Sequence, residues 1–164
     1  MIRIPRPLLK QVVDAAEAAY PAECCGLLAG RDAGAGTIAV TRVVPSLNLA
    51  PPAGGGDGPP IDRFEVDPQV RFDLMQALDG TGERIVGHYH SHPDHPAQPS
   101  ETDLAMAFEP DLAWLIVAVA GGQAIHVTAH AVDAERRQFH PLPLVTDDWR
   151  PYPVRPDSAK DSTA

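Results

Sequence analysis

Two histidines one residue apart are the part of this chain whose residue types and spacing best suit a metal site. His90 and His92 lie in a segment that predicts a β-strand, because Ile85 and Val86 lead into it and Pro93 ends its hydrogen bonding. Alternate side chains of a strand share a face, so the two Cα atoms are expected about 6.6 Å apart. Two imidazoles at that spacing can converge on one ion.

A third ligand follows the two histidines. Pro99 and Ser100 before an apolar run predict a helix start with Ser100 as N-cap, and Asp103 falls in the first turn. Three protein ligands leave the fourth tetrahedral position of zinc for water, which is the arrangement of a catalytic site. The same residues also suit an ordinary helix N-cap with an acid in the first turn, which needs no metal.

Three further residues could enter such a site. His88 shares the strand face of His90, but its spacing to the downstream serine and aspartate differs, so we interpret it as a neighbour. His95 follows in a loop, where a solvated histidine is favoured over one lining a cleft. Cys25 has the parity of Glu23, which could bring its thiol toward the site, but a small buried apolar residue is the favoured interpretation.

Composition and charge exclude several function classes. The 164 residues fit one domain, and a net charge of -9, with 13 Lys and Arg against 22 Asp and Glu, argues against nucleic-acid binding. No apolar run approaches the roughly 20 residues that span a bilayer, and the first residues lack an apolar signal core. The adjacent Cys24 and Cys25 cannot close a loop by a disulfide. These features predict a cytoplasmic protein without membrane partners, and they leave its oligomeric state open.

Hydrophobic periodicity predicts an α/β or α+β fold, with helices packed on a mixed sheet. An antiparallel hairpin is expected from residues 23–29 and 37–45, in which Gly26 permits close backbone approach. Helix 7–19 should face the core with Leu8, Val12, Ala15, Ala16 and Ala19, and helix 67–78 with Val70, Leu74, Ala77 and Leu78. The other expected elements are an edge strand at 2–4, an extended segment at 64–66, strands at 84–92, 113–119, 124–132 and 138–144, and a helix at 100–108.

Two segments have a composition that favours irregular structure. Residues 50–60 are rich in proline and glycine, which predicts a flexible loop inserted within one sheet, either a solvated connection or a substrate-facing flap. Residues 148–164 are polar and proline-rich, and we expect a disordered tail. Residues 1–147 are therefore expected to form the folded domain.

The motif residues also resemble a known family. The series His90-Ser91-His92, seven residues, Ser100, two residues, Asp103, with Glu23 upstream, resembles the motif of JAMM (MPN-plus) zinc metalloproteases of the short prokaryotic type. The resemblance covers roughly residues 2–144 and implies the JAMM/MPN fold, a cytidine-deaminase-like mixed sheet flanked by helices. Residues 1–147 would then be the catalytic domain.

The resemblance also implies a role for each motif residue. His90, His92 and Asp103 would bind one zinc ion per chain, Glu23 would act as general acid/base, and Ser100 would stabilise an oxyanion. The implied reaction is hydrolysis of a peptide or isopeptide bond after the Gly-Gly C-terminus of a ubiquitin-like or sulfur-carrier protein. Such a reaction could serve sulfur transfer or the biosynthesis of cysteine or a cofactor.

Two other function classes compete with this interpretation. A non-catalytic MPN-type scaffold that binds protein partners is disfavoured, because this sequence keeps every ligand of the motif. A metal-dependent deaminase or amidase for a small molecule is suggested only by fold analogy. The deaminase signature needs a Cys-x-x-Cys pair, and the adjacent Cys24 and Cys25 do not have that spacing.

Overall fold

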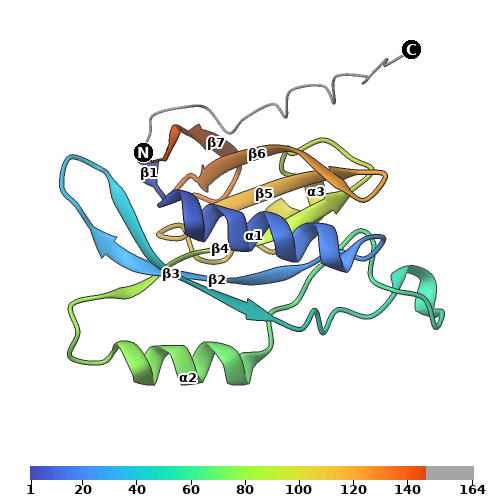
Figure 1. Ribbon diagram of the computed structural model, residues 1–164, viewed down its shortest axis with the longest axis horizontal. Coiled ribbons are helices and arrows are strands. Elements are labelled where there is room, and N and C mark those ends of the chain that lie inside the picture. Colours follow the sequence, from blue (N-terminus) through green and yellow to red (C-terminus); the bar gives the residue numbers. More distant parts are fainter. Residues whose placement is uncertain (147–164) are drawn as a thin grey trace, which may run out of the picture.

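One eight-stranded mixed sheet organises residues 1–146, which are the part of the chain that the computed structural model describes, apart from the side chain of Ala53 (Figure 1). The expected tail at 148–164 lies outside the described residues. The strands are β1 (Ile2–Arg3), β2 (Cys25–Asp32), β3 (Ile38–Ser46), β4 (Arg84–Pro93), β5 (Ala113–Ala120), β6 (Gln123–Val132), β7 (Phe139–Leu142) and β8 (Leu144–Val145). The helices are α1 (Arg6–Ala19), α2 (Pro68–Leu78), α3 (Glu101–Ala105) and a 3-10 turn, η1 (Ala53–Gly55).

Strands β4 and β2 lie in the middle of the sheet, whose order is β7-β6-β5-β4-β2-β3-β1-β8. Strand β2 pairs antiparallel with β3 and β4, which confirms the expected hairpin, and β4 pairs parallel with β5. The mixed sheet flanked by helices is thus confirmed. A central strand buried on both faces reads as a continuous apolar run, and Ala113–Ala120 has that pattern.

The two long helices cover different faces of the sheet. Leu28 of β2 packs in the cluster that includes α1, whereas its neighbour Leu27 packs with Leu74 and Leu78 of α2. Successive strand residues point to opposite faces, so α1 and α2 lie on opposite sides, with β2 between them in Figure 1. None of the helices within residues 1–146 is long and apolar enough to cross a membrane.

The predicted inward face of α1 is confirmed but was incomplete. Val12 and Ala16 are buried as expected, but Leu9 and Val13 complete the buried stripe, and Leu8 is only partly buried. The helix begins at Arg6, with Pro5 before it, one residue earlier than the sequence predicted.

The start of α2 confirms the sequence prediction. Asp67 is its N-cap, and the carboxylate of Asp67 accepts a hydrogen bond from the backbone N–H of Gln69. The helix ends at Leu78 as expected. Ala77, however, is exposed and does not face the core, because the buried stripe of this short helix is narrow and runs through Leu74 and Leu78.

The terminal strands depart from the prediction. Strand β1 is not an edge strand, since it pairs parallel with both β3 and β8. The predicted strand at 138–144 is divided at Pro143, which has no N–H for a ladder. Strand β7 before Pro143 pairs with β6, and β8 after it pairs with β1. A single residue therefore joins the two ends of the sheet, which nearly closes it.

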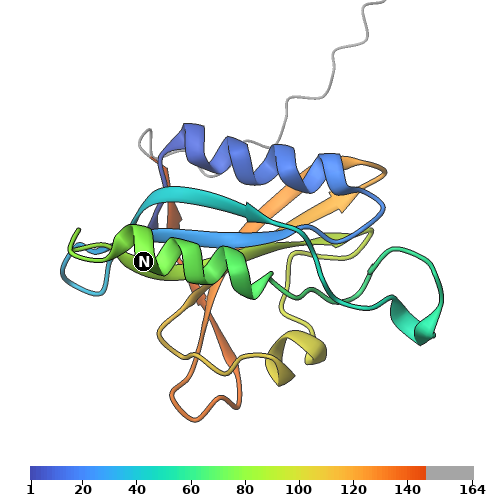
Figure 2. The ribbon, with the colours of Figure 1, turned by 90° about the horizontal axis from the view of Figure 1, so that it is seen from below.

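Two local predictions also need correction. Helix α3 ends at Ala105 instead of continuing to residue 108, and Pro110 follows shortly after this end. A Cβ atom at Gly26 would lie 2.4 Å from the ring of Tyr89, so a side chain, not the backbone, makes the close approach. The 50–60 segment carries the turn η1 and projects from one end of the sheet (Figure 2).

Candidate metal centre

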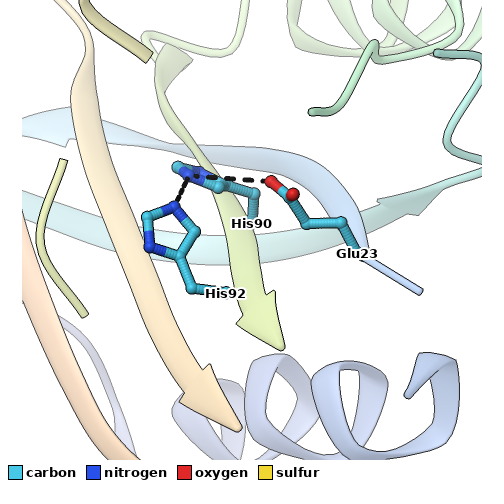
Figure 3. A group of neighbouring side chains, drawn as sticks. All are labelled: Glu23, His90 and His92. Atoms are coloured by element: carbon cyan, nitrogen blue, oxygen red, sulfur yellow. Dashed lines mark hydrogen bonds and ion pairs between the residues drawn. The ribbon is translucent and has the colours of Figure 1, made fainter. Parts of the chain in front are cut away.

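The imidazoles of His90 and His92 converge at the C-terminal end of the central strand β4. The two rings approach each other in Figure 3, and their Nε2 atoms are 3.0 Å apart. The His90 side chain is fully buried. The two-residue spacing places both side chains on one face of the strand, as the sequence indicated. The neighbouring strands β2 and β5 pair with β4 at His90, so the backbone that carries this ligand is fixed on both sides.

Asp103 brings a carboxylate to the same point from α3. Its Oδ1 lies 3.2 Å from Nε2 of His90, and its Oδ2 lies 3.2 Å from Nε2 of His92. Ser100 orients this aspartate through a capping box, in which each residue's side chain accepts a hydrogen bond from the other's backbone N–H. Asp103 therefore takes part in the helix cap and is also a candidate ligand, so the two interpretations of the sequence are compatible.

The three donors fit a zinc ion. Ligands at about 2.05 Å from a tetrahedral zinc are separated from one another by about 3.3 Å. The two Nε2 atoms are 3.0 Å apart, and each lies 3.2 Å from a different oxygen of the Asp103 carboxylate, so the separations of the donor groups lie close to that value. Two imidazole nitrogens and a carboxylate oxygen are also a common donor set for zinc. The geometry and the chemistry of His90, His92 and Asp103 therefore suit this metal.

Glu23 lies beside this group but farther from its centre. It precedes β2 and is buried, and its carboxylate points toward His90 in Figure 3. Its Oε1 lies 4.0 Å from Nε2 of His90. Glu23, His90 and His92 together place one donor atom each within 4.8 Å of one another. Because the Asp103 carboxylate is closer to both imidazoles, Asp103 is the better candidate ligand. Glu23 is placed to act on a group held next to it.

Burial and nearby charges shift the pKa values of the two carboxyl groups in opposite directions. Burial raises the pKa of Glu23 to about 8, and the nearby Asp103 adds to this effect. Burial also raises the pKa of Asp103, but the adjacent imidazoles of His90 and His92 outweigh it and hold that pKa well below its usual range. Asp103 therefore stays ionised, as a ligand must, while Glu23 can take up and release a proton near neutral pH.

A cavity of about 330 Å³ opens onto this group, and Ser100 lies in its wall. Ser100 is exposed, and its oxygen accepts a hydrogen bond from the backbone N–H of Asp103. Its own proton can point into the cavity. The cavity lining includes Glu23, Ile61, Asp62, His92, Ser100 and Thr102.

Three supporting residues were missed by the sequence analysis. Ser91, between the two histidines, is fully buried, and its Oγ accepts a hydrogen bond from the backbone N–H of Cys24. The carbonyl oxygen of Pro96 lies 2.9 Å from Nδ1 of His92, and the ring of Phe64 stacks on His90. The strand period places Ser91 on the opposite face from the histidines, but nothing in the sequence pairs Pro96 or Phe64 with them.

The other residues considered for the site have separate places. The ring of His88 packs edge-on against Trp114, with centroids 4.1 Å apart, and burial lowers its pKa to about 3. His95 is exposed, as expected, but also lines the cavity. The Cys25 thiol is buried and lies 3.7 Å from the carbonyl oxygen of Leu47, as expected for a small buried side chain.

The fold and the site define a class of protein. A mixed sheet carries two histidines at the end of its central strand, with an aspartate and a buried glutamate beside them, as in JAMM-type metallopeptidases. The family model described as prokaryotic homologues of the JAB domain matches residues 5–135. The chain belongs to this family.

Two curated relatives are similar over about two thirds of this chain. A desampylase of Haloferax volcanii is 36% identical over 106 residues, which cover 65% of this chain and 69% of the relative. A CysO-cysteine peptidase of Mycobacterium tuberculosis is 31% identical over 110 residues, covering 67% of this chain and 68% of the relative.

Solved structures share the fold over most of the chain. The solution structure of a protein from Desulfitobacterium hafniense matches with a TM-score of 0.72 and 27% identity, covering 89% of this chain and 92% of that one. A structure described as a JAMM metalloprotease-like zinc site in the proteasome and signalosome matches with a TM-score of 0.52 and 18% identity, covering 89% and 97%. The second likeness supports the fold alone.

Proposed function

We propose that this protein is a zinc-dependent peptidase that cleaves the bond after the Gly-Gly C-terminus of a ubiquitin-like or sulfur-carrier protein. The observation that carries the proposal is the convergence of His90, His92 and Asp103 on one point, with the protonatable carboxyl of Glu23 beside it. One such site is expected per chain.

His90, His92 and Asp103 hold the metal in this proposal. The Pro96 carbonyl beside Nδ1 of His92 fixes the tautomer of that ring, so its Nε2 carries the lone pair for the metal. When bound, zinc supplies a Lewis acid that lowers the pKa of water to about 7 and polarises a carbonyl group. The chain supplies the fixed ligands and the dry surroundings, since all three side chains are buried.

Glu23 moves the proton in this mechanism. Its carboxyl takes a proton from the attacking water and later delivers it to the leaving amine, so no covalent intermediate with the protein is needed. The pKa of about 8 that burial confers on Glu23 falls when a cation binds nearby, because a positive charge favours the ionised form. The proximity of Glu23 to the candidate ligands supports its role as a base.

Ser100 is placed to steady the developing negative charge. Its exposed hydroxyl lies in the wall of the same cavity as Glu23 and His92, and its proton is not needed for the helix cap. A hydrogen bond from this hydroxyl to the carbonyl oxygen under attack becomes stronger as that oxygen becomes an oxyanion.

The names of the relatives support the proposed substrate class. A desampylase and a CysO-cysteine peptidase suggest conjugates of small carrier proteins, and the second name suggests a role in sulfur transfer or in cysteine or cofactor biosynthesis. A diglycine tail can lie extended in a narrow groove and pair with a strand edge. The segment around Phe64, next to the 50–60 loop, borders the site and is a candidate for that edge. Two free, adjacent cysteines accord with a cytoplasmic location.

A metal and cleavage assay tests the proposed function. Protein purified without added metal is expected to contain about one zinc per chain and to cleave a Gly-Gly-tailed carrier conjugate, while His92→Ala made identically loses both. Zinc binding without any cleavage of carrier conjugates would favour the scaffold function. Equal metal content in the parent and in His92→Ala would contradict the site itself.

A further inference from the structure

The side chain of Asn48 makes four hydrogen bonds, which use its full capacity. Its Nδ2 donates to the carbonyl oxygens of Glu23 at 3.1 Å and Arg63 at 3.0 Å. Its Oδ1 accepts from the backbone N–H groups of Ala50 and Glu65, each at 3.0 Å. One side chain therefore joins both ends of the 50–63 segment to the backbone of Glu23.

These hydrogen bonds bring the two ends of the 50–63 segment together. Residues 48 and 66 also form an isolated antiparallel bridge, and the N–H of Leu49 donates to the carbonyl oxygen of Glu65 at 2.9 Å. Between these two ends, the segment contributes Ile61 and Asp62 to the lining of the cavity that opens onto the metal centre. The position of this cavity wall thus depends on the contacts of Asn48.

Glu23 needs such contacts because it lies outside the sheet. Strand β2 begins at Cys25, so the ladder does not hold the backbone of Glu23. Its N–H donates instead to the carbonyl oxygen of Pro60 at 2.9 Å, and its carbonyl oxygen accepts from Asn48. Both backbone groups of Glu23 are therefore held by the 48–60 region. On the other side, the Cys24 N–H is held by Ser91 of β4.

We propose that Asn48 is a positioning residue that fixes Glu23 against the metal centre and closes the 50–63 segment into a cavity wall. The inference rests on the proposed role of Glu23 in proton transfer. Asn48 makes no contact with His90, His92 or Asp103 in the described hydrogen bonds, so it acts on the position of the acid/base and not on metal binding. A displacement of about 1 Å at a catalytic group can lower a rate about 100-fold.

Two substitutions distinguish the hydrogen bonds that Asn48 donates from those that it accepts. Asn48→Asp keeps oxygen acceptors for Ala50 and Glu65 but loses the donors, and it sets a carboxylate against the carbonyl oxygens of Glu23 and Arg63. Asn48→Ala removes all four hydrogen bonds. Ser46→Ala is a matched control at the end of β3, two residues before Asn48, because it removes the hydrogen bonds of Ser46 Oγ with the N–H of Asp67 and the carbonyl oxygen of Leu47 without touching Glu23 or the 50–63 segment.

Steady-state kinetics on a cleavable carrier conjugate test whether the hydrogen bond from Asn48 positions Glu23. Asn48→Asp should lower kcat about 10- to 100-fold while KM changes less than about threefold, and the zinc content should stay at the parent value. Ser46→Ala should keep the parent kcat. A parent-like kcat in Asn48→Asp would show that Glu23 does not depend on this donor and would overturn the proposal.

Amide hydrogen exchange followed by NMR tests the arrangement without any turnover. The Glu23 amide should exchange about tenfold faster in both Asn48 variants, whereas the Ala50 and Glu65 amides should do so only in Asn48→Ala. The Leu28 amide in β2 and the Ser46→Ala protein serve as controls. Unchanged exchange at Glu23 in both variants would overturn the inference. If exchange responds as expected but the parent cleaves no conjugate, the arrangement stands and the proposed function fails.

Discussion

The ring of Phe64 lies stacked on the imidazole of His90, with centroids 4.3 Å apart and 18° between the two planes. This contact distinguishes the two candidate histidine ligands. His92 is oriented by the Pro96 carbonyl at its Nδ1, whereas Nδ1 of His90 has no hydrogen-bond partner among the described residues. Stacking on Phe64 and edge contact with Trp114 orient His90 instead.

Removing the stacked ring should therefore weaken metal binding. Phe64→Ala is expected to lower zinc affinity about tenfold, as loss of a residue that orients a metal ligand commonly does. Competition with a chromogenic chelator measures the affinity directly. Phe139→Ala is the matched control, because Phe139 packs on Trp114 at 5.0 Å but makes no ring contact with His90. Equal affinities of the two variants would mean that stacking does not orient His90.

Asp103 takes part in both the helix cap and the candidate metal site, and two substitutions should distinguish these roles. Asp103→Ala should lose zinc and cleavage together, because it removes the carboxylate closest to both imidazoles. Ser100→Ala removes the other half of the capping box and should cost about 1 kcal/mol of stability, yet keep one zinc per chain. Its kcat should fall about 100-fold if the hydroxyl stabilises the oxyanion. Zinc content, thermal unfolding and kcat together distinguish these effects.

The carboxyl of Glu23 is expected to matter for turnover but not for metal content. Glu23→Gln keeps the size and burial of the side chain but cannot take up a proton, so hydrolysis should fall at least about 100-fold. Zinc content should equal that of the parent, since Asp103 and not Glu23 is the carboxylate nearest both imidazoles. Undiminished turnover in this variant would remove Glu23 as the acid/base, and loss of zinc would make it a ligand.

Sequence alone predicted the parts of this site that depend on local rules. The strand period placed His90 and His92 on one face, and the capping pattern placed Asp103 beside Ser100, because both depend on residues close together in the chain. The distance from Glu23 to His90 could not be derived that way. It depends on the pairing of β2 with β4, across more than 60 residues, and here a family resemblance supplied the prediction.

The elements that the sequence analysis missed depend on long-range contacts. No local pattern shows that Asn48 would reach Glu23, since its four partners lie 2 to 25 residues away. The short strand β1 was predicted as an edge because its second partner, β8, is far from it in the sequence and no local pattern shows their pairing. The turn η1 in the 50–60 loop likewise has no hydrophobic period that could have revealed it.

The two buried thiols predict a loss of stability at high pH. Burial raises the pKa of Cys24 from an ordinary 9.0 to about 11 and that of Cys25 to about 12. Since the folded values are raised, the stability contributed by the neutral thiols is complete below about pH 9 and is lost as the pH rises through the folded values.

The expected loss is on the order of 3 kcal/mol per thiol between pH 9 and 12. Urea unfolding of the parent at pH 7 to 11 measures most of this loss, and the double variant Cys24→Ala, Cys25→Ala is the control, because burial also raises the pKa of Tyr89, so that its ionisation on unfolding lowers stability in the same range. The variant should be less stable at pH 7 but should lose less stability as the pH rises. If the free energy of unfolding falls equally with pH in the two proteins, the thiols do not have to remain neutral in the folded state.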